Sequence, residues 1–264
     1  MSYTSGIYLL VGLPVLVLIC AIVPQMLRRL AILGFSYLFF FTFSKYLIVY
    51  IFATTLWTYI IGRGLGYLTN RRKVLTKDLP REERKKITNH MKRQSRAVMI
   101  VGIGALLLVL LYLKYFNFFG EIINAIASKE MISAVSLMAP IGISFYTLQA
   151  ISYMVDVYWE KTEAEKSLLK IAMFLCFFPQ VMEGPIALYS DTAQQIYEAK
   201  KPTMDSVIDG TIRILWGLFK KLLVADRLNV VVAALFDHYQ DYSGIMMLFA
   251  GIAYTAQLYC EFSG

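Results

Sequence analysis

Long apolar runs with few charges restrict the folds open to this sequence. Hydrophobic residues make up 58% of the 264 residues, whereas a soluble domain is typically about 45–50% apolar. A helix needs roughly 20 apolar residues to cross a bilayer, and irregular backbone facing lipid is not tolerated there. We therefore predict an all-α, polytopic membrane protein, with spans near residues 6–24, 30–44, 46–68, 97–119, 131–154, 167–188 and 243–262.

The net charge of +8 is concentrated in one segment. Residues 71–96 carry 11 Lys/Arg and 3 Asp/Glu, and the rest of the chain is neutral overall. This localised charge, flanked by predicted spans, argues against a nucleic-acid-binding protein. We expect residues 69–96 to be a cytoplasmic loop that follows the positive-inside rule, with a short solvated helix starting after Pro80. A more specific alternative is a surface for anionic lipid headgroups.

Residues 177–186, FFPQVMEGPI, combine an apolar context with a broken backbone and a charge. Pro179 and the Gly184–Pro185 pair disfavour a regular helix, and Glu183 is costly if it faces lipid. Broken backbone at membrane depth is tolerated where it is covered by protein or lines a wet cavity. The stretch therefore predicts either part of an internal polar site or a membrane-edge loop whose glutamate reaches water.

Two other apolar stretches contain similar polar residues. Residues 139–160, APIGISFYTLQAISYMVDVYWE, contain Ser144, Tyr146 and Gln149. Such residues in a span usually form hydrogen bonds between helices, and the alternative is that they line a polar tunnel. Residues 253–264, AYTAQLYCEFSG, contain another polar set, which comprises Gln257, Glu261 and Ser263.

An amphipathic helix is expected over residues 205–227. Its apolar positions, from Ile208 to Leu222, recur at helical spacing, and charged residues from Asp209 to Arg227 lie opposite them. Such a helix lies in the membrane interface or packs at the wet edge of a helix bundle.

The three polar-apolar stretches, in this order, resemble signatures of the membrane-bound O-acyltransferase family. The closest similarity is to its bacterial branch that O-acetylates alginate, and it extends from about residue 8 to Gly264, strongest from Pro140 onward. The resemblance implies one integral-membrane domain, 1–264, with about seven to eight helices in a partial ring around a polar channel. The expected lining residues are Ser144, Tyr146, Gln149, Pro179, Gln180, Glu183, Gly184, Pro185, Gln257, Glu261 and Ser263.

The resemblance also implies a reaction. An acyl group, expected to be acetyl, would pass from a cytoplasmic donor such as acetyl-CoA or another acyl thioester to hydroxyls of an extracytoplasmic, alginate-like polysaccharide. A separate extracytoplasmic acetyl-transfer protein would assist. We expect a multi-pass protein of the plasma membrane with no bound cofactor, no metal and no nucleic-acid partner.

The catalytic histidine of the family is expected beyond Gly264. The two histidines of the chain, His90 and His238, match no family position. The sequence also departs from the family at Glu183, where many relatives have a small residue, and at Glu261, where aspartate is common. We therefore expect an acyltransferase that lacks its catalytic half and is inactive alone. The alternatives are a transport or translocation protein, since broken helices with buried carboxylates also suit a solute path, and a non-catalytic membrane scaffold.

Overall fold

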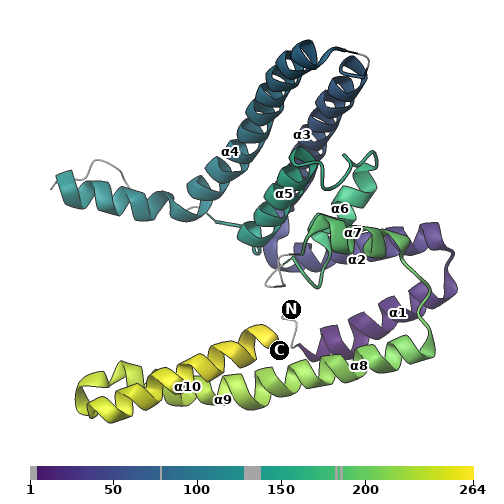
Figure 1. Ribbon diagram of the computed structural model, residues 1–264. Helices are drawn as coiled ribbons and strands as arrows, with labels where there is room; N and C mark the ends of the chain where they lie inside the picture. The colour runs from purple at the N-terminus through teal and green to yellow at the C-terminus, as the bar shows by residue number, and fades with distance from the viewer. Residues whose placement is uncertain (1–4, 78, 128–137, 182–183, 185–186) are drawn as a thin grey trace. The chain divides into compact units, whose positions relative to one another are not determined.

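The computed structural model describes residues 5–77, 79–127, 138–181, 184 and 187–264, and within these residues all regular structure is helical (Figure 1). The chain divides into two units. The larger comprises Gly12–Lys200, and the smaller comprises Lys201–Gly264 together with a short N-terminal segment that ends at Val11. The all-α prediction is confirmed for the described residues.

The helices Gln25–Ser44 and Ile48–Leu75 fit the second and third predicted spans, whereas the first predicted span, 6–24, contains a shorter apolar helix, Leu13–Ile22, of 10 residues. A π-helical turn, Tyr8–Gly12, leads into α1, and a short 3₁₀ turn, Lys45–Leu47, separates α2 from α3. The bounds are Leu13–Ile22 for α1, Gln25–Ser44 for α2 and Ile48–Leu75 for α3.

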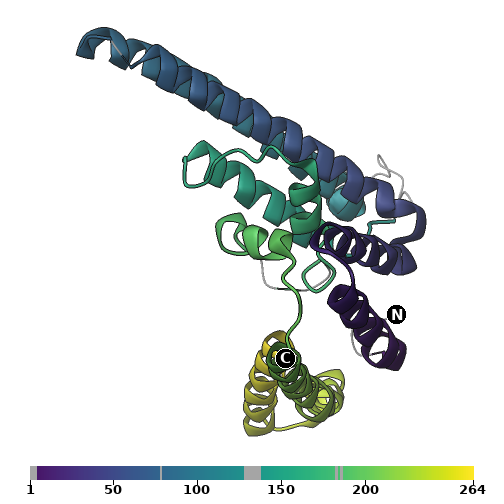
Figure 2. The same ribbon diagram turned by 90° about the vertical axis from the view of Figure 1, so that its right-hand side faces the viewer.

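The predicted basic loop is largely helical. Residues 69–75 belong to α3, and residues 81–96 are the first turns of the 47-residue helix α4, Arg81–Ala127. The solvated helix and the predicted span at 97–119 are thus one helix, because no glycine or proline separates them. Helices α3 and α4 lie side by side in both views (Figures 1 and 2).

Two predicted spans differ from the structure. In place of a span at 131–154, helix α5 begins only at Ile143, and residues 128–137 lie outside the described part. Within the predicted span at 167–188, the described chain forms a nine-residue helix, α6, followed by a turn, because Pro179 prevents α6 from continuing. A further short helix, α7, begins just after this range, at Tyr189. The bounds are Ile143–Tyr158 for α5, Leu168–Cys176 for α6 and Tyr189–Glu198 for α7.

Helix α5 is buried by several neighbours in the larger unit. It packs against α3, α4, α6 and α7. Its side chains Ala150, Tyr153 and Met154 join buried residues of these neighbours in one apolar cluster. The burial of α5 on several sides explains why polar residues on this helix lie inside the protein.

The smaller unit is a bundle of three helices with an irregular centre. Thr203 and Ser206 form a capping box that starts α8. A π-helical segment, Phe219–Ala225, interrupts the predicted amphipathic helix, and a 3₁₀ turn, Tyr239–Asp241, precedes α10. The bounds are Met204–Leu218 for α8, Asp226–Asp237 for α9 and Gly244–Ser263 for α10.

Three helical stretches of the described chain are long and apolar enough to cross a membrane, namely Gln25–Leu75, Arg81–Ala127 and Gly244–Ser263. The protein is an all-α membrane protein. The ring of seven to eight helices around a channel stays a prediction.

Candidate functional site

Helix α5 carries polar side chains on its buried face. Gly142, with φ 72°, takes a left-handed conformation that favours glycine and turns the chain into α5. The side chains that follow are almost fully enclosed: Tyr146 is 0% exposed and Gln149 is 1% exposed. Both were predicted to line an internal polar site, and the structure places both inside.

The polar side-chain atoms of Tyr146 and Gln149 have no hydrogen-bond partner in the described part of the chain. The Tyr146 hydroxyl and both amide atoms of Gln149 are buried and have no partner among the described residues. Their surroundings are apolar, since Tyr146 belongs to a cluster with Phe40, Ile51 and Val181. Leaving a buried polar group unpaired costs about 1–3 kcal/mol, so such groups in a folded protein call for an explanation. A bound polar ligand would supply the missing partners.

Contacts at the two ends of α5 indicate how deep these groups lie. Arg96 Nε donates to Tyr158 Oη at 3.5 Å, and Lys114 Nζ donates to Ser144 Oγ at 3.3 Å. Helix α5 therefore runs antiparallel to α4. Arg96 and Lys114 are 18 residues apart in α4, or about 27 Å along the axis, close to the roughly 30 Å of a bilayer core. Gln149 lies between these two levels.

Ser144 forms a hydrogen bond between helices, the first of the two roles considered for it, and its partner is Lys114 of α4. Ser144 is half-buried and bonds to Lys114 of α4, so it does not share the buried face of Tyr146 and Gln149. Sequence reasoning missed Lys114, although a lone cation in an apolar run was a visible signal. Its level near one end of the span lets the ammonium reach the membrane interface.

The turn after α6 contributes one more unpaired group. Gln180 N and Val181 N both donate to Phe177 O, at 2.9 and 3.1 Å, and close the turn. Gln180 Oε1 is buried without a partner among the described residues. Val181 shares the apolar cluster of Tyr146, so this turn adjoins the buried face of α5.

The other predicted residues of this stretch are placed only in part. Pro179 is exposed and Gly184 is half-buried. Glu183 and Pro185 lie outside the described residues, so the predicted role of the glutamate is untested.

A second polar cluster, at residues 160–170, was not predicted. Glu165 accepts hydrogen bonds from Tyr189 Oη at 2.9 Å and Ser167 N at 3.0 Å, and it pairs with Lys170 at 3.1 Å. Burial raises the pKa of the Glu165 carboxyl, but these hydrogen bonds and the lysine outweigh it, so the pKa is lowered overall. The Tyr153 hydroxyl accepts from Glu165 N at 3.0 Å. The Glu165 carboxylate thus links α6 to α7, and the backbone N–H of the same residue links this segment to α5.

In the smaller unit, Gln257 and Glu261 face neighbouring helices as their spacing predicts. Gln257 Nε2 donates to Asn229 Oδ1 at 3.1 Å, and Gln257 Oε1 is buried without a described partner. Glu261 is not an isolated intramembrane carboxylate, because Lys221 of the π-helical segment pairs with it and with Asp226, the latter at 3.1 Å.

Ser263 is engaged by the same π-helical segment. Lys220 Nζ donates to Ser263 O at 3.0 Å and approaches Ser263 Oγ at 3.3 Å. A π-helix brings consecutive lysines toward α10, and such segments are frequent at functional sites. Sequence periodicity gave no signal for it.

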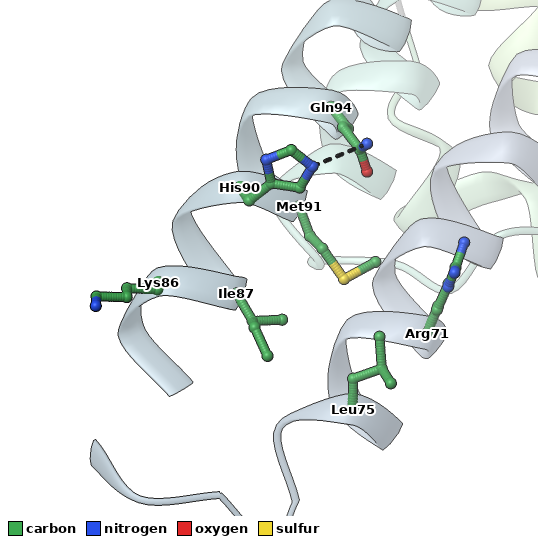
Figure 3. Close-up of a pocket in the computed structure, with 7 residues that line it drawn as sticks. All are labelled: Arg71, Leu75, Lys86, Ile87, His90, Met91 and Gln94. Carbon is green, nitrogen blue, oxygen red and sulfur yellow. Dashed lines mark hydrogen bonds between the residues drawn. The ribbon is translucent and has the colours of Figure 1, made fainter. Parts of the chain in front are cut away.

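The two histidines were expected to be solvated or interfacial residues, and no metal was expected. His90 and His238 are exposed, as expected of solvated residues. His90 lines a surface hollow between α3 and α4 that contains none of the predicted site residues (Figure 3). Among the described residues, no group of three or more His, Cys, Asp or Glu side chains is placed to hold a metal ion.

Comparison with known proteins gives relatives along the whole chain. The probable alginate O-acetylase AlgI of Pseudomonas putida is 32% identical over 267 residues, which cover 100% of this chain and 50% of that protein. The probable alginate O-acetylase AlgI of Pseudomonas aeruginosa is 30% identical, and the match covers 100% of this chain and 47% of that protein. A peptidoglycan O-acetyltransferase of Helicobacter pylori is 28% identical over 195 residues, 64% of this chain and 37% of that protein.

The match is to the N-terminal half of these relatives. The chain spans about half the length of the curated AlgI relatives it matches. No protein-family model and no solved structure matches it. Over its full length the chain therefore matches the N-terminal half of acyltransferases of the membrane-bound O-acyltransferase type.

Proposed function

We propose that the chain is part of an enzyme that transfers an acetyl group to hydroxyls of an extracytoplasmic polysaccharide. The observation that carries this proposal is the similarity to alginate O-acetylases over 100% of the chain. We further propose an alginate-like exopolysaccharide as the acceptor, because the peptidoglycan O-acetyltransferase matches only 64% of the chain.

The unpaired groups of Tyr146, Gln149 and Gln180 are proposed to line the acyl path. A primary amide offers two donors and an acceptor, so Gln149 suits both a thioester carbonyl and an acceptor hydroxyl. The depth of Gln149 in the membrane supports this role, because the acyl group has to pass from one side of the bilayer to the other. Acetyl-CoA or another acyl thioester is the proposed donor.

The remaining parts of the proposal concern topology and partners. We place the protein in the plasma membrane with residues 69–96 in the cytoplasm, the side on which the donor is made. An extracytoplasmic acetyl-transfer protein is the proposed partner. Neither histidine of this chain is assigned as the base, because His90 and His238 are both exposed.

The test replaces Gln149 by leucine in the natural gene. The O-acetyl content of the cell-surface polysaccharide should fall about tenfold or more, as expected when a hydrogen bond worth about 1.5–3 kcal/mol is lost from the reacting complex. Gln149→Leu removes an unpaired buried amide, so the thermal stability of the purified protein should stay equal or rise. The matched control is Leu148→Met, because Leu148 is the preceding residue and is 41% exposed. This control should change neither the O-acetyl content of the polysaccharide nor the thermal stability of the protein.

A strain in which the gene is deleted distinguishes the proposed function from its alternatives. If polysaccharide esters persist in every fraction of the deletion strain, the proposed function is wrong. If polysaccharide export falls while its degree of acetylation is unchanged, the transport alternative replaces it.

A further inference from the structure

A hollow lies between the C-terminal end of α3 and the N-terminal end of α4 (Figure 3). Its volume is about 410 Å³, within the roughly 300–1,000 Å³ range of small-molecule sites. The seven residues that line it are Arg71, Leu75, Lys86, Ile87, His90, Met91 and Gln94. All belong to the two helices, so the hollow is formed by a rigid hairpin.

The charged residues that line the hollow are positive, and no carboxylate of the described chain pairs with them. None of its lining residues is acidic. The next two residues of α3, Arg72 and Lys73, are both paired with Glu160. In contrast, Arg71 and Lys86 form no ion pair with any carboxylate of the described chain.

Most polar groups of the hollow are donors, and the amide oxygen of Gln94 is an acceptor. Gln94 Nε2 lies 3.2 Å from His90 Nε2. When the amide donates, Nε2 of the neutral imidazole accepts, and the proton lies on Nδ1, which is then a donor as well. In Figure 3 the Arg71 side chain runs along its own helix, α3, at one edge of the hollow, and the Lys86 ammonium extends away from the gap on the far side of α4. An anion with several acceptor oxygens suits this set.

The base of the hollow is apolar. Leu75, Ile87 and Met91 lie between the two helices in Figure 3, and Met91 is 5% exposed. A ligand that carries an apolar or aromatic part beside its anionic group would cover this surface.

The position along α4 distinguishes a soluble ligand from a lipid. Arg96 is the last charge before the apolar run, and His90 and Lys86 precede it by six and ten residues. These separations correspond to about 9 and 15 Å along the helix. The headgroup layer on each side of a bilayer is about 5–7 Å thick, so the outer end of the hollow, at His90 and Lys86, opens to water beyond the headgroups, whereas Gln94, two residues from Arg96, lies at their level.

We propose that this hollow binds a water-soluble phosphate ester, with the phosphate on Arg71 and the organic part against Leu75 and Ile87. The site is independent of the proposed acyl transfer.

Binding is measured on the full chain in nanodiscs of phosphatidylcholine, with adenosine diphosphate and inorganic pyrophosphate as probes. Both should bind saturably, and the nucleotide several-fold more tightly. Arg71→Gln should weaken both about tenfold, the equivalent of about 1.4 kcal/mol. Lys92→Gln changes an exposed cation of the same helix outside the hollow and should weaken either by less than about twofold. Ile87→Ser should reduce the advantage of the nucleotide over pyrophosphate.

Three results would overturn the proposal. The first is that neither probe saturates. The second is equal loss in Lys92→Gln and Arg71→Gln, which means diffuse attraction to the basic segment. The third combines two observations: nanodiscs with phosphatidylglycerol abolish nucleotide binding, and the Arg71→Gln variant no longer retains that lipid. Together they would mean that a lipid headgroup occupies the hollow.

Discussion

Arg28 of α2 donates a hydrogen bond from Nη1 to the carbonyl oxygen of Ala199, 171 positions away, at 2.6 Å. The same guanidinium donates to Cys20 O at 2.7 Å and to Val23 O at 3.0 Å. Arg28 is only 7% exposed, and Ala199 has a positive φ of 44°. One buried side chain thus ties the α1–α2 corner to the end of α7.

Replacing Arg28 by alanine should destabilise the larger unit by about 2–4 kcal/mol, because three buried carbonyl groups lose a charged donor. Thermal unfolding in detergent measures the change. Lys200→Ala is the matched control, since Lys200 is an exposed residue whose ion pair with Glu198 should contribute less than about 1 kcal/mol. Equal melting temperatures for the two variants would show that the corner is held by other contacts.

Close approach between α3 and Tyr153 gives a second prediction. A Cβ on Gly62 would lie 2.7 Å from Tyr153 Cε1 and 2.8 Å from its hydroxyl oxygen, whereas a Cβ on Gly64 would meet nothing nearer than 3.9 Å. Gly62→Ala should therefore destabilise the protein by about 1–3 kcal/mol through overpacking. Gly64→Ala, on the same helix, should be neutral or stabilising because alanine favours helix. Unfolding in denaturant compares the two, and a stabilising Gly62→Ala would contradict the packing of α5 on α3.

Different parts of the fold were predictable to different degrees. Membrane helices follow from apolar length alone, and the buried positions of Tyr146 and Gln149 follow from polar residues within such a run. The pairing of Lys221 with Glu261 depends on a π-helical segment, which hydrophobic periodicity does not encode. The join between the basic helix and the span in α4 was detectable, because no breaker interrupts residues 81–96. The charge of that segment was mistaken for a loop signal.

The Glu165 carboxylate makes stability depend on pH. Its folded-state pKa is lowered below the ordinary glutamate value, so its contribution is present above the unfolded pKa and lost as pH falls through the folded pKa. The melting temperature should therefore decrease as pH is lowered from about 5 through the ordinary glutamate pKa of about 4.3 and below. Glu165→Gln should flatten this part of the profile. Glu163→Gln, at a position without an ion pair in the described chain, should leave the slope as it is; equal slopes in all three proteins would contradict the role given to Glu165.

The proposed topology predicts opposite accessibility for two exposed positions. Tyr46, 86% exposed, lies between α2 and α3, and Lys92 lies in the basic part of α4. Since α3 crosses between these levels, Tyr46→Cys should react with a membrane-impermeant maleimide in intact spheroplasts, and Lys92→Cys only in inside-out vesicles. The background carries Cys260→Ser, because Cys20 and Cys176 are buried and Cys260 is partly exposed. Labelling of both positions from one side would mean that α3 does not span the membrane, and reversed labelling would place the basic segment outside the cytoplasm.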